Sequence, residues 1–211
     1  IGRSRYNLFK EKLGYLENGS QTLLDAMVCH IEAAGGQIRL ESPVTEVHIR
    51  DGAVHAVESD GLLETFDRVV STIPLPFVPR LIPDLPASIL DAYRSVNNIA
   101  VVCVIVKLAK PLSENFWVNI NDPDMDIPGL VEYSNLQSLD QHVVYVPYYL
   151  PGDHPSFAQP DEWFKERVCG YLKVINPELT EQDIIDVRSS RYRFAQPICE
   201  PGFSDKLPPV E

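Results

Sequence analysis

The first apolar positions of the chain repeat with the period of a helix. They are spaced as on one helical face: Leu23, Leu24, Met27, Val28 and Ile31. Ser20 precedes this run and a pair of glycines at positions 35 and 36 follows it. Serine is a favoured N-cap and glycine a favoured stop, so the pattern predicts a helix over residues 21–34.

Beyond the glycines the apolar period changes to two, which is typical of strands. A short strand is predicted over residues 37–40. Asp51-Gly52 and Asp60-Gly61 are hairpin-turn signals between alternating segments. Residues 46–66 are therefore predicted to form a three-stranded antiparallel meander.

A largely apolar run over residues 68–73 ends at Pro74. Runs of this kind suit a strand buried on both faces, as in a parallel sheet. Five prolines follow between positions 74 and 86, which favours a crossing between two domains. A helix is expected to begin at Pro86, because proline is tolerated in the first helical turn.

The second half of the chain is rich in predicted strands, separated by loops of Asn, Asp and Pro that favour antiparallel neighbours. The predicted strands cover residues 99–107, 116–120, 130–134, 142–149 and 187–194. A helix is predicted from Asp161 to Asn176. Thr180 and Asp183 resemble a capping box that opens a short helix through Asp186. The tail over 195–211 is expected to be irregular.

Composition narrows the classes of function. The 211 residues carry a net charge of −12 and no basic patch, which argues against a nucleic-acid partner. The longest wholly apolar run is Ile99–Val106, far too short for a membrane span. The four cysteines are too far apart for C-x-x-C pairs and are expected to be buried free thiols in the reducing cytoplasm. The sequence shows no metal-ligand spacing and no nucleophile motif, and His48 and His55 are expected to face solvent.

The order of these segments resembles a known family. The predicted helix, Ala34-Gly35-Gly36, a strand, Pro43-Val44, the meander and the run from Asp67 to Pro74 follow one another as in the flavin-containing amine oxidase superfamily. Residues 14–23 and 192–199 are similar to the flanking segments of that family. Protoporphyrinogen oxidase-like proteins are the subgroup that the chain resembles best. Phytoene desaturases and UDP-galactopyranose mutases are further members of the superfamily.

The resemblance implies an α/β (α+β) fold in two lobes. Residues 1–79 would form part of an FAD-binding lobe, with a helix, a β-meander and a buried strand. Residues 80–194 would form a substrate-binding lobe with a largely antiparallel mixed sheet and packed helices. Residues 195–211 would return toward the FAD lobe.

The resemblance also implies a cofactor site. The backbone of Val44 would pair with the adenine edge of FAD, and Thr72, Ile73 and Pro74 would line the cofactor where a strand ends. From the residues alone, an ordinary strand start and an ordinary strand end stay open for these positions. Five aromatic residues would either line a pocket facing the flavin or pack in the core: Trp117, Tyr133, Tyr145, Tyr148 and Tyr149.

Family members hold the flavin pyrophosphate at a helix N-terminus reached through G-x-G-x-x-G, and no G-x-G occurs here. FAD is therefore expected in a full-length parent, of which this chain is an internal portion, and this chain alone is expected to hold it weakly or not at all. The expected function is a portion of an FAD-dependent oxidoreductase that takes a hydride equivalent from a small organic substrate. A flavin-dependent sugar-nucleotide mutase and a non-catalytic binding module are the alternatives, and a homo-oligomer is expected from unpaired sheet edges.

Overall fold

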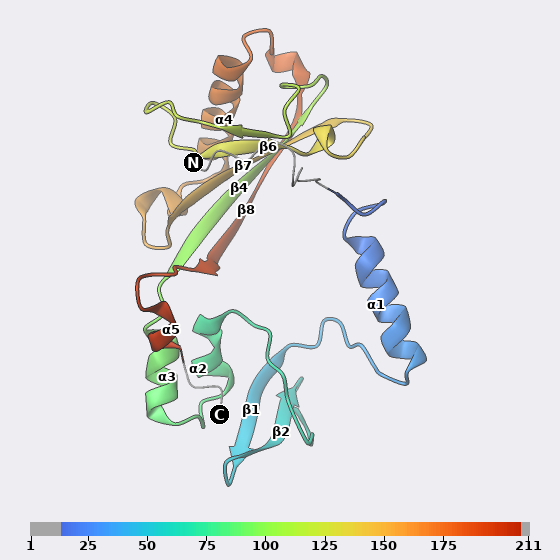
Figure 1. The fold of residues 1–211 in the computed structure, drawn as a ribbon, viewed down its shortest axis with the longest axis vertical. Coiled ribbons are helices and arrows are strands. Elements are labelled where there is room, and N and C mark those ends of the chain that lie inside the picture. The colour runs from blue at the N-terminus through green and yellow to red at the C-terminus, as the bar shows by residue number, and fades with distance from the viewer. Residues whose placement is uncertain (1–13, 208–211) are drawn as a thin grey trace, which may run out of the picture.

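The computed structural model describes residues 14–207, which form two lobes and a separate helix (Figure 1). One lobe contains a three-stranded sheet and two short helices. The other contains a five-stranded sheet with a longer helix packed on it. Every strand pair in both sheets is antiparallel, and the mixed α/β class predicted from the sequence is confirmed.

The meander is confirmed in the smaller lobe. Its strands lie in the order β1 (Val44–Arg50), β2 (Ala53–Ser59) and β3 (Leu62–Glu64). At the first turn Asp51 and Gly52 have φ of 52° and 76°, and at the second Asp60 and Gly61 have φ of 53° and 75°. Tight hairpin turns need this left-handed backbone, and Asp-Gly is among the pairs that adopt it most readily.

The proline-rich segment forms a short 3₁₀ turn, η1 (Leu75–Phe77), and two helices, α2 (Val78–Leu81) and α3 (Ala87–Arg94). Helix α2 contacts β1, and α3 packs against α2 and η1. These helices therefore lie beside the meander, and the chain enters the larger lobe between Arg94 and Asn98. The return connection lies next to this crossing, because the Ile198 amide donates to the Asn97 carbonyl at 2.8 Å.

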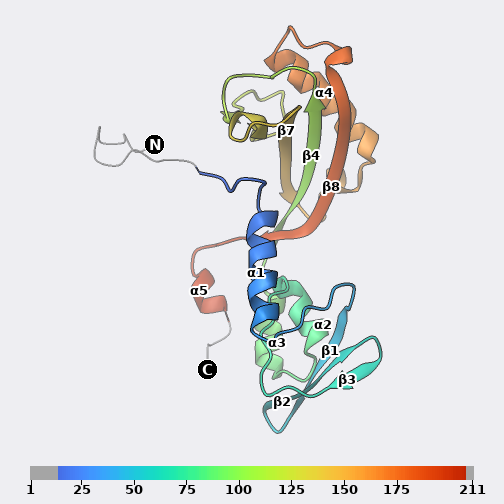
Figure 2. The ribbon, with the colours of Figure 1, turned by 90° about the vertical axis from the view of Figure 1, so that its right-hand side faces the viewer.

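The larger lobe is built on the sheet order β5-β6-β7-β4-β8. The strands are β4 (Asn98–Leu108), β5 (Trp117–Asn119), β6 (Gly129–Glu132), β7 (His142–Pro151) and β8 (Ile184–Pro197). Helix α4 (Asp161–Ile175) packs along one face (Figure 2). Alternate residues of β4 are fully buried beneath it, together with Phe164, Val168 and Leu172. The remaining short elements are η2 (Tyr133–Asn135), η3 (Pro155–Ala158), η4 (Glu181–Asp183) and α5 (Phe203–Lys206).

A buried carboxylate fixes the loop between β4 and β5. The side chain of Glu132, at the end of β6, has no exposed surface. It accepts hydrogen bonds from the backbone N–H groups of Leu112 and Ser113, both at 2.8 Å, and from the Ser113 hydroxyl at 3.2 Å. Each oxygen thus has a donor, which is what a buried charge without an ion-pair partner requires.

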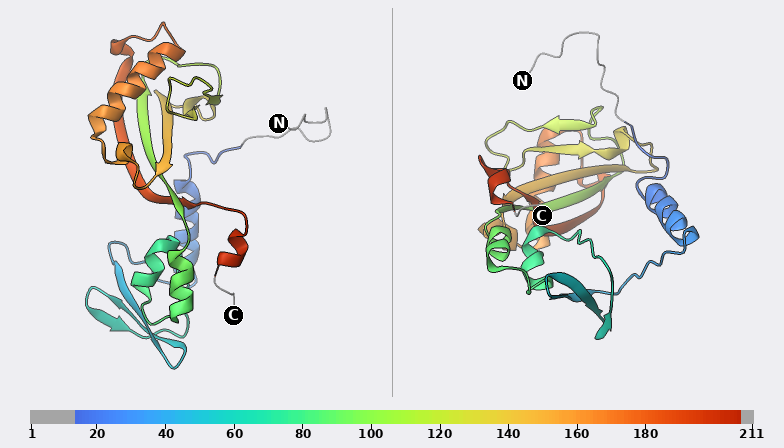
Figure 3. Two further views of the ribbon diagram at one scale, coloured as in Figure 1. Left: turned by 90° about the vertical axis from the view of Figure 1, so that its left-hand side faces the viewer. Right: turned by 60° about the horizontal axis from the view of Figure 1, so that its bottom comes forward.

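Helix α1 (Gln21–Ala33) matches the predicted helix and stands apart from both sheets (Figure 3). None of its residues is buried. Leu24 and Met27 on its apolar face are each 52% exposed, and the Ser20 side chain makes no capping hydrogen bond. The chain exposes 15,589 Å² in all, whereas a compact protein of this mass leaves about 9,800 Å². Among residues 14–207, no helix is both long and apolar enough to cross a membrane.

Two predicted strands are wrong. Residues 37–40 and 68–73 run outside both sheets, and Val70 is 87% exposed. An extended segment becomes a strand only when another strand pairs with it, and no described strand lies along either segment. The short helix expected through Asp186 is also wrong, because η4 ends at Asp183 and β8 begins at once. Its Thr180–Asp183 capping box is present, as predicted.

The expectation that all four cysteines are buried is wrong for two of them. Cys29 and Cys199 are exposed, while Cys103 and Cys169 are partly buried. Cys29 lies on α1, whose apolar face no described residue covers. All four have free thiols in the structure.

Candidate functional site

A groove of about 700 Å³ lies in the smaller lobe between the meander and the proline-rich segment. Val44, Thr72, Ile73 and Pro74 all line it, although β1 and the 68–74 segment are separated in sequence by the meander. The other lining residues are Pro43, Thr45, Val47, Val57, Val69, Val70, Ser71, Phe77, Arg80 and Leu81. The four positions proposed from the resemblance therefore share one surface.

One wall of the groove is the start of β1. Pro43 precedes the strand and has no N–H, and Val44 is its first residue, opposite Ser59 on β2. The register shifts between Val44 and Glu46, so the strand entrance departs from a regular ladder. Val47 closes the bottom of the wall, with only 2% of its surface exposed.

The opposite wall is the extended segment from Val69 to Pro74. From Val69 to Ile73, its backbone N–H and C=O groups form no backbone hydrogen bond with other described residues. The Pro74 carbonyl accepts a hydrogen bond from the Phe77 N–H at the start of η1. Extended backbone presents donors and acceptors side by side, and such groups need partners when they are covered. The wall therefore offers a ligand both apolar side chains and free main-chain groups.

The groove is mostly apolar, and Arg80 is the charged residue among those that line it. The hydroxyls of Thr45, Ser71 and Thr72 are the side-chain hydrogen-bonding groups beside it. Sequence reasoning missed Arg80 and Phe77, because they reach the groove only through the chain reversal at η1 and α2. The prolines on either side of them were the signal that the chain turns here.

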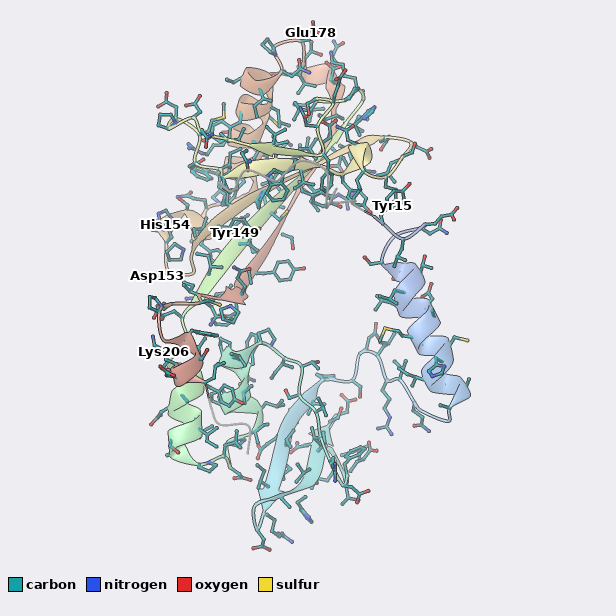
Figure 4. The ribbon with its side chains drawn as sticks, in the orientation of Figure 1. Tyr15, Tyr149, Asp153, His154, Glu178 and Lys206 are labelled. Carbon is teal, nitrogen blue, oxygen red and sulfur yellow. The ribbon has the colours of Figure 1, made fainter. Side chains whose placement is uncertain are left out.

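A second surface is the face of the five-stranded sheet that α4 leaves open. The strand register places Trp117, Val131, Tyr145 and Ile105 in one row across four strands. Another row joins Tyr149, Val101 and Tyr192. Figure 4 shows Tyr149 at the end of β7 nearest the smaller lobe. Sequence reasoning missed Tyr192, whose side chain is exposed.

The aromatic residues on the strands divide between the two faces of the sheet, as strand alternation requires. Tyr145 and Tyr149 lie on the open face, and Tyr148 points into the core, where its ring meets Phe164 edge to face at 5.1 Å. Tyr133 meets Tyr145 edge to face at 6.0 Å. Core packing is thus the role of Tyr148, and the other four remain available to a ligand.

The middle of the open face carries the Tyr145 hydroxyl and the Cys103 thiol, and charged residues lie on the same face toward β8. Burial raises the pKa of the Tyr145 hydroxyl, and the neighbouring Tyr133 adds to the rise. Burial also raises the pKa of the Cys103 thiol, which lies between Pro147 and Ser190 in the register. At the margin, Arg188 is paired with Asp186 at 2.9 Å. The middle of the face therefore favours an uncharged, apolar or aromatic ligand.

Comparison with solved structures finds proteins of similar fold. A candidate protoporphyrinogen oxidase from Exiguobacterium sp. 255-15 is 23% identical, with a TM-score of 0.73 over 90% of this chain and 42% of that one. An oxidoreductase from Methanosarcina mazei is 18% identical, with a TM-score of 0.67 over 84% and 43%. A reduced UDP-galactopyranose mutase is 10% identical, with a TM-score of 0.70 over 90% and 42%.

These likenesses show that the chain shares the fold of these three solved structures. The family described as flavin containing amine oxidoreductase matches residues 1–196, and the chain belongs to that family. The chain spans less than half the length of these solved structures. No curated protein matches it.

Proposed function

We propose that this chain is the portion of an FAD-dependent oxidoreductase that carries the adenine side of the flavin site and most of the substrate lobe. The observation that carries the proposal is the groove that gathers Val44, Thr72, Ile73 and Pro74. The FAD-binding lobe would extend past residue 79, the boundary expected from the sequence, to Arg94, because α2 and α3 lie beside the meander. Residues 98–194 would form the substrate lobe, with 195–211 returning toward the first. Membership of the flavin amine oxidoreductase family supports this assignment.

The groove fits one end of FAD. Its apolar walls suit a flat adenine, and the main-chain groups beside Val44 and along Val69–Ile73 suit the hydrogen-bonding edge of that ring. Arg80 would lie near the anionic part of the cofactor. When bound, FAD supplies the hydride-accepting chemistry, and the protein supplies position and electrostatics.

The fit stops at the pyrophosphate. That group is usually held at a helix N-terminus reached through closely spaced glycines, and the sequence contains no G-x-G. Residues outside this chain would have to supply that part of the site. The chain would therefore contribute recognition of adenine rather than the full affinity for FAD.

The open sheet face would hold the substrate. Trp117, Tyr133, Tyr145 and Tyr149 offer aromatic surface and neutral hydroxyls, which suit a small organic molecule with an apolar or aromatic body. The likeness to a UDP-galactopyranose mutase supports a flavin-dependent mutase as the second candidate. A mutase requires the reduced flavin but oxidises nothing overall, so net substrate oxidation by the complete flavoprotein separates the two.

A pair of substitutions at Val44 tests the adenine contact in the complete flavoprotein. Val44→Ala keeps the N–H and C=O groups, so we expect FAD affinity to change by no more than about twofold. Val44→Pro removes the N–H and should weaken FAD binding about tenfold, the equivalent of one lost hydrogen bond. Proline is tolerated as the first residue of an edge strand, and circular dichroism checks that the fold is retained. Equal losses of affinity in both variants would contradict the backbone contact.

A further inference from the structure

A cluster of metal-ligating side chains lies where the meander meets the proline-rich segment. Glu46 and His48 come from β1 and Asp84 from the loop between α2 and α3. One ligand atom from each residue lies within 4.8 Å of the others. A fourth group, Glu58 on β2, brings its carboxylate to 3.5 Å from His48 Nε2.

The backbone holds these four groups together. Glu46 and His48 are two residues apart on one strand and so point to the same side. Glu58 is directly opposite Glu46 in the β1–β2 register. The Ile49 N–H donates to Asp84 Oδ2 at 3.2 Å, which ties a residue 35 positions further along the chain to the edge of β1.

The cluster has more negative charge than its neighbours balance. Two carboxylates directly opposite each other across a strand pair repel. Among residues 14–207, His48 is the basic group within ion-pair distance of Glu46 and Glu58, and its Nδ1 lies 3.3 Å from Glu46. His48 was expected to face solvent, yet its side chain is only 30% exposed. Its Nε2 is shielded from solvent and has no hydrogen-bond partner among the described residues.

We propose that Glu46, His48 and Asp84 bind a divalent transition-metal ion of the Zn²⁺ class, with Glu58 beside the imidazole. Zn²⁺ takes imidazole nitrogen and carboxylate oxygen at about 2.0–2.2 Å, which places tetrahedral ligand atoms about 3.3 Å apart. The side chains need to close by about 1.5 Å at most, which rotamer changes of partly exposed carboxylates allow. A carboxylate next to the second imidazole nitrogen is the usual support for a metal-bound histidine.

A bound ion would join β1 to the loop that follows α2. Both elements border the groove: Val44 and Val47 are on β1, and Arg80 and Leu81 are on α2. The ion would therefore fix β1, one wall of the groove, relative to the α2 end of the proline-rich segment, without entering the groove. This role is independent of whether the groove binds FAD.

Calorimetric titration of the purified 211-residue chain with ZnCl₂ tests the site. Exposed thiols also bind zinc, so Cys29 and Cys199 are first replaced by serine. We expect one Zn²⁺ per chain, and a higher melting temperature with zinc than without it. Ca²⁺, which prefers oxygen ligands alone, should bind at least tenfold more weakly.

Two variants locate the ion and one controls for the loss of a histidine. His48→Gln and Asp84→Asn should each lower Zn²⁺ affinity about tenfold or more and abolish the zinc-induced rise in melting temperature. His55→Gln removes an exposed histidine of β2 and should leave the affinity within about twofold. Circular dichroism without metal checks that each variant is folded. Absence of stoichiometric binding, or equal losses in the His48 and His55 variants, would overturn the proposal.

Discussion

Replacing Glu132 should destabilise the larger lobe more than any exposed carboxylate does. The Glu132 carboxylate is fully buried and takes three hydrogen bonds from Leu112 and Ser113. In Glu132→Gln one amide oxygen can still accept, but the amide NH₂ group faces an N–H donor. In Glu132→Ala both backbone donors lose their partner inside the protein.

The magnitude follows from those lost partners. A buried donor left unpaired costs about 1–3 kcal/mol, so Glu132→Gln should lower the free energy of unfolding by about 2 kcal/mol. Glu132→Ala leaves two such donors and a cavity, and the loss should be about 3–4 kcal/mol. The loss of unfolding free energy in Glu132→Ala stays below the summed energy of three hydrogen bonds to a charged group. The reason is that the substitution also removes a buried charge, which is favourable.

Urea denaturation followed by far-ultraviolet circular dichroism measures the change, with thermal melting as a second reading. At about 2–4 °C per kcal/mol for a protein of this size, Glu132→Gln should melt about 4–8 °C lower. Glu114→Gln is the matched control, because it makes the same change at an exposed residue of the same loop. Hydrogen exchange at the Leu112 and Ser113 amides should also accelerate in both Glu132 variants. A Glu132→Gln protein within about 0.5 kcal/mol of the original, the range of an ordinary surface change, would refute the reasoning.

Three further outcomes are expected. The pKa of Asp183 is lowered to about 2, chiefly by its hydrogen bonds from Thr180. The stabilising effect of the Asp183 carboxylate should therefore be complete above the ordinary pKa near 4 and should disappear as the pH falls toward 2. In denaturation experiments, Asp183→Asn should lower the free energy of unfolding at pH 6 and leave it nearly unchanged at pH 2. Thiol titration should find two fast groups, Cys29 and Cys199, in the native protein and four after denaturation; fewer than four would indicate a disulfide. Equilibrium dialysis of the 211-residue chain against FAD should show weak or no binding, and stoichiometric micromolar binding would mean that the pyrophosphate is held in another way.

Local chemistry accounts for the parts of the fold that the sequence predicted well. Asp51-Gly52 and Asp60-Gly61 specify their own backbone conformation, so the meander could be located to within about two residues. The strand over residues 142–149 was also predicted, and its alternation puts Tyr148 and Tyr145 on opposite faces of the sheet. These features depend on neighbours in sequence.

The features that the sequence did not predict depend on contacts between residues far apart in the chain. Val69 and Val70 have the composition of a buried strand, but pairing requires a partner strand that no described residue provides. The groove could be anticipated at Val44 and Thr72 only through the family resemblance. Arg80 and Asp84 reach their sites because the proline-rich segment folds back on β1, and no residue type in the sequence encodes that contact.

The two tryptophans of the chain both belong to the larger lobe. Trp117 is 55% exposed at β5, while Trp163 on α4 meets Phe164 edge to face at 4.8 Å and lies under Arg167. Tryptophan fluorescence therefore reports on the larger lobe rather than on the groove. If the unfolding transition followed by tryptophan emission coincides with the one followed by circular dichroism, the two lobes unfold together. A tryptophan introduced at Phe77 would report on the smaller lobe, because the Phe77 ring meets Phe194 across the lobe junction at 5.2 Å.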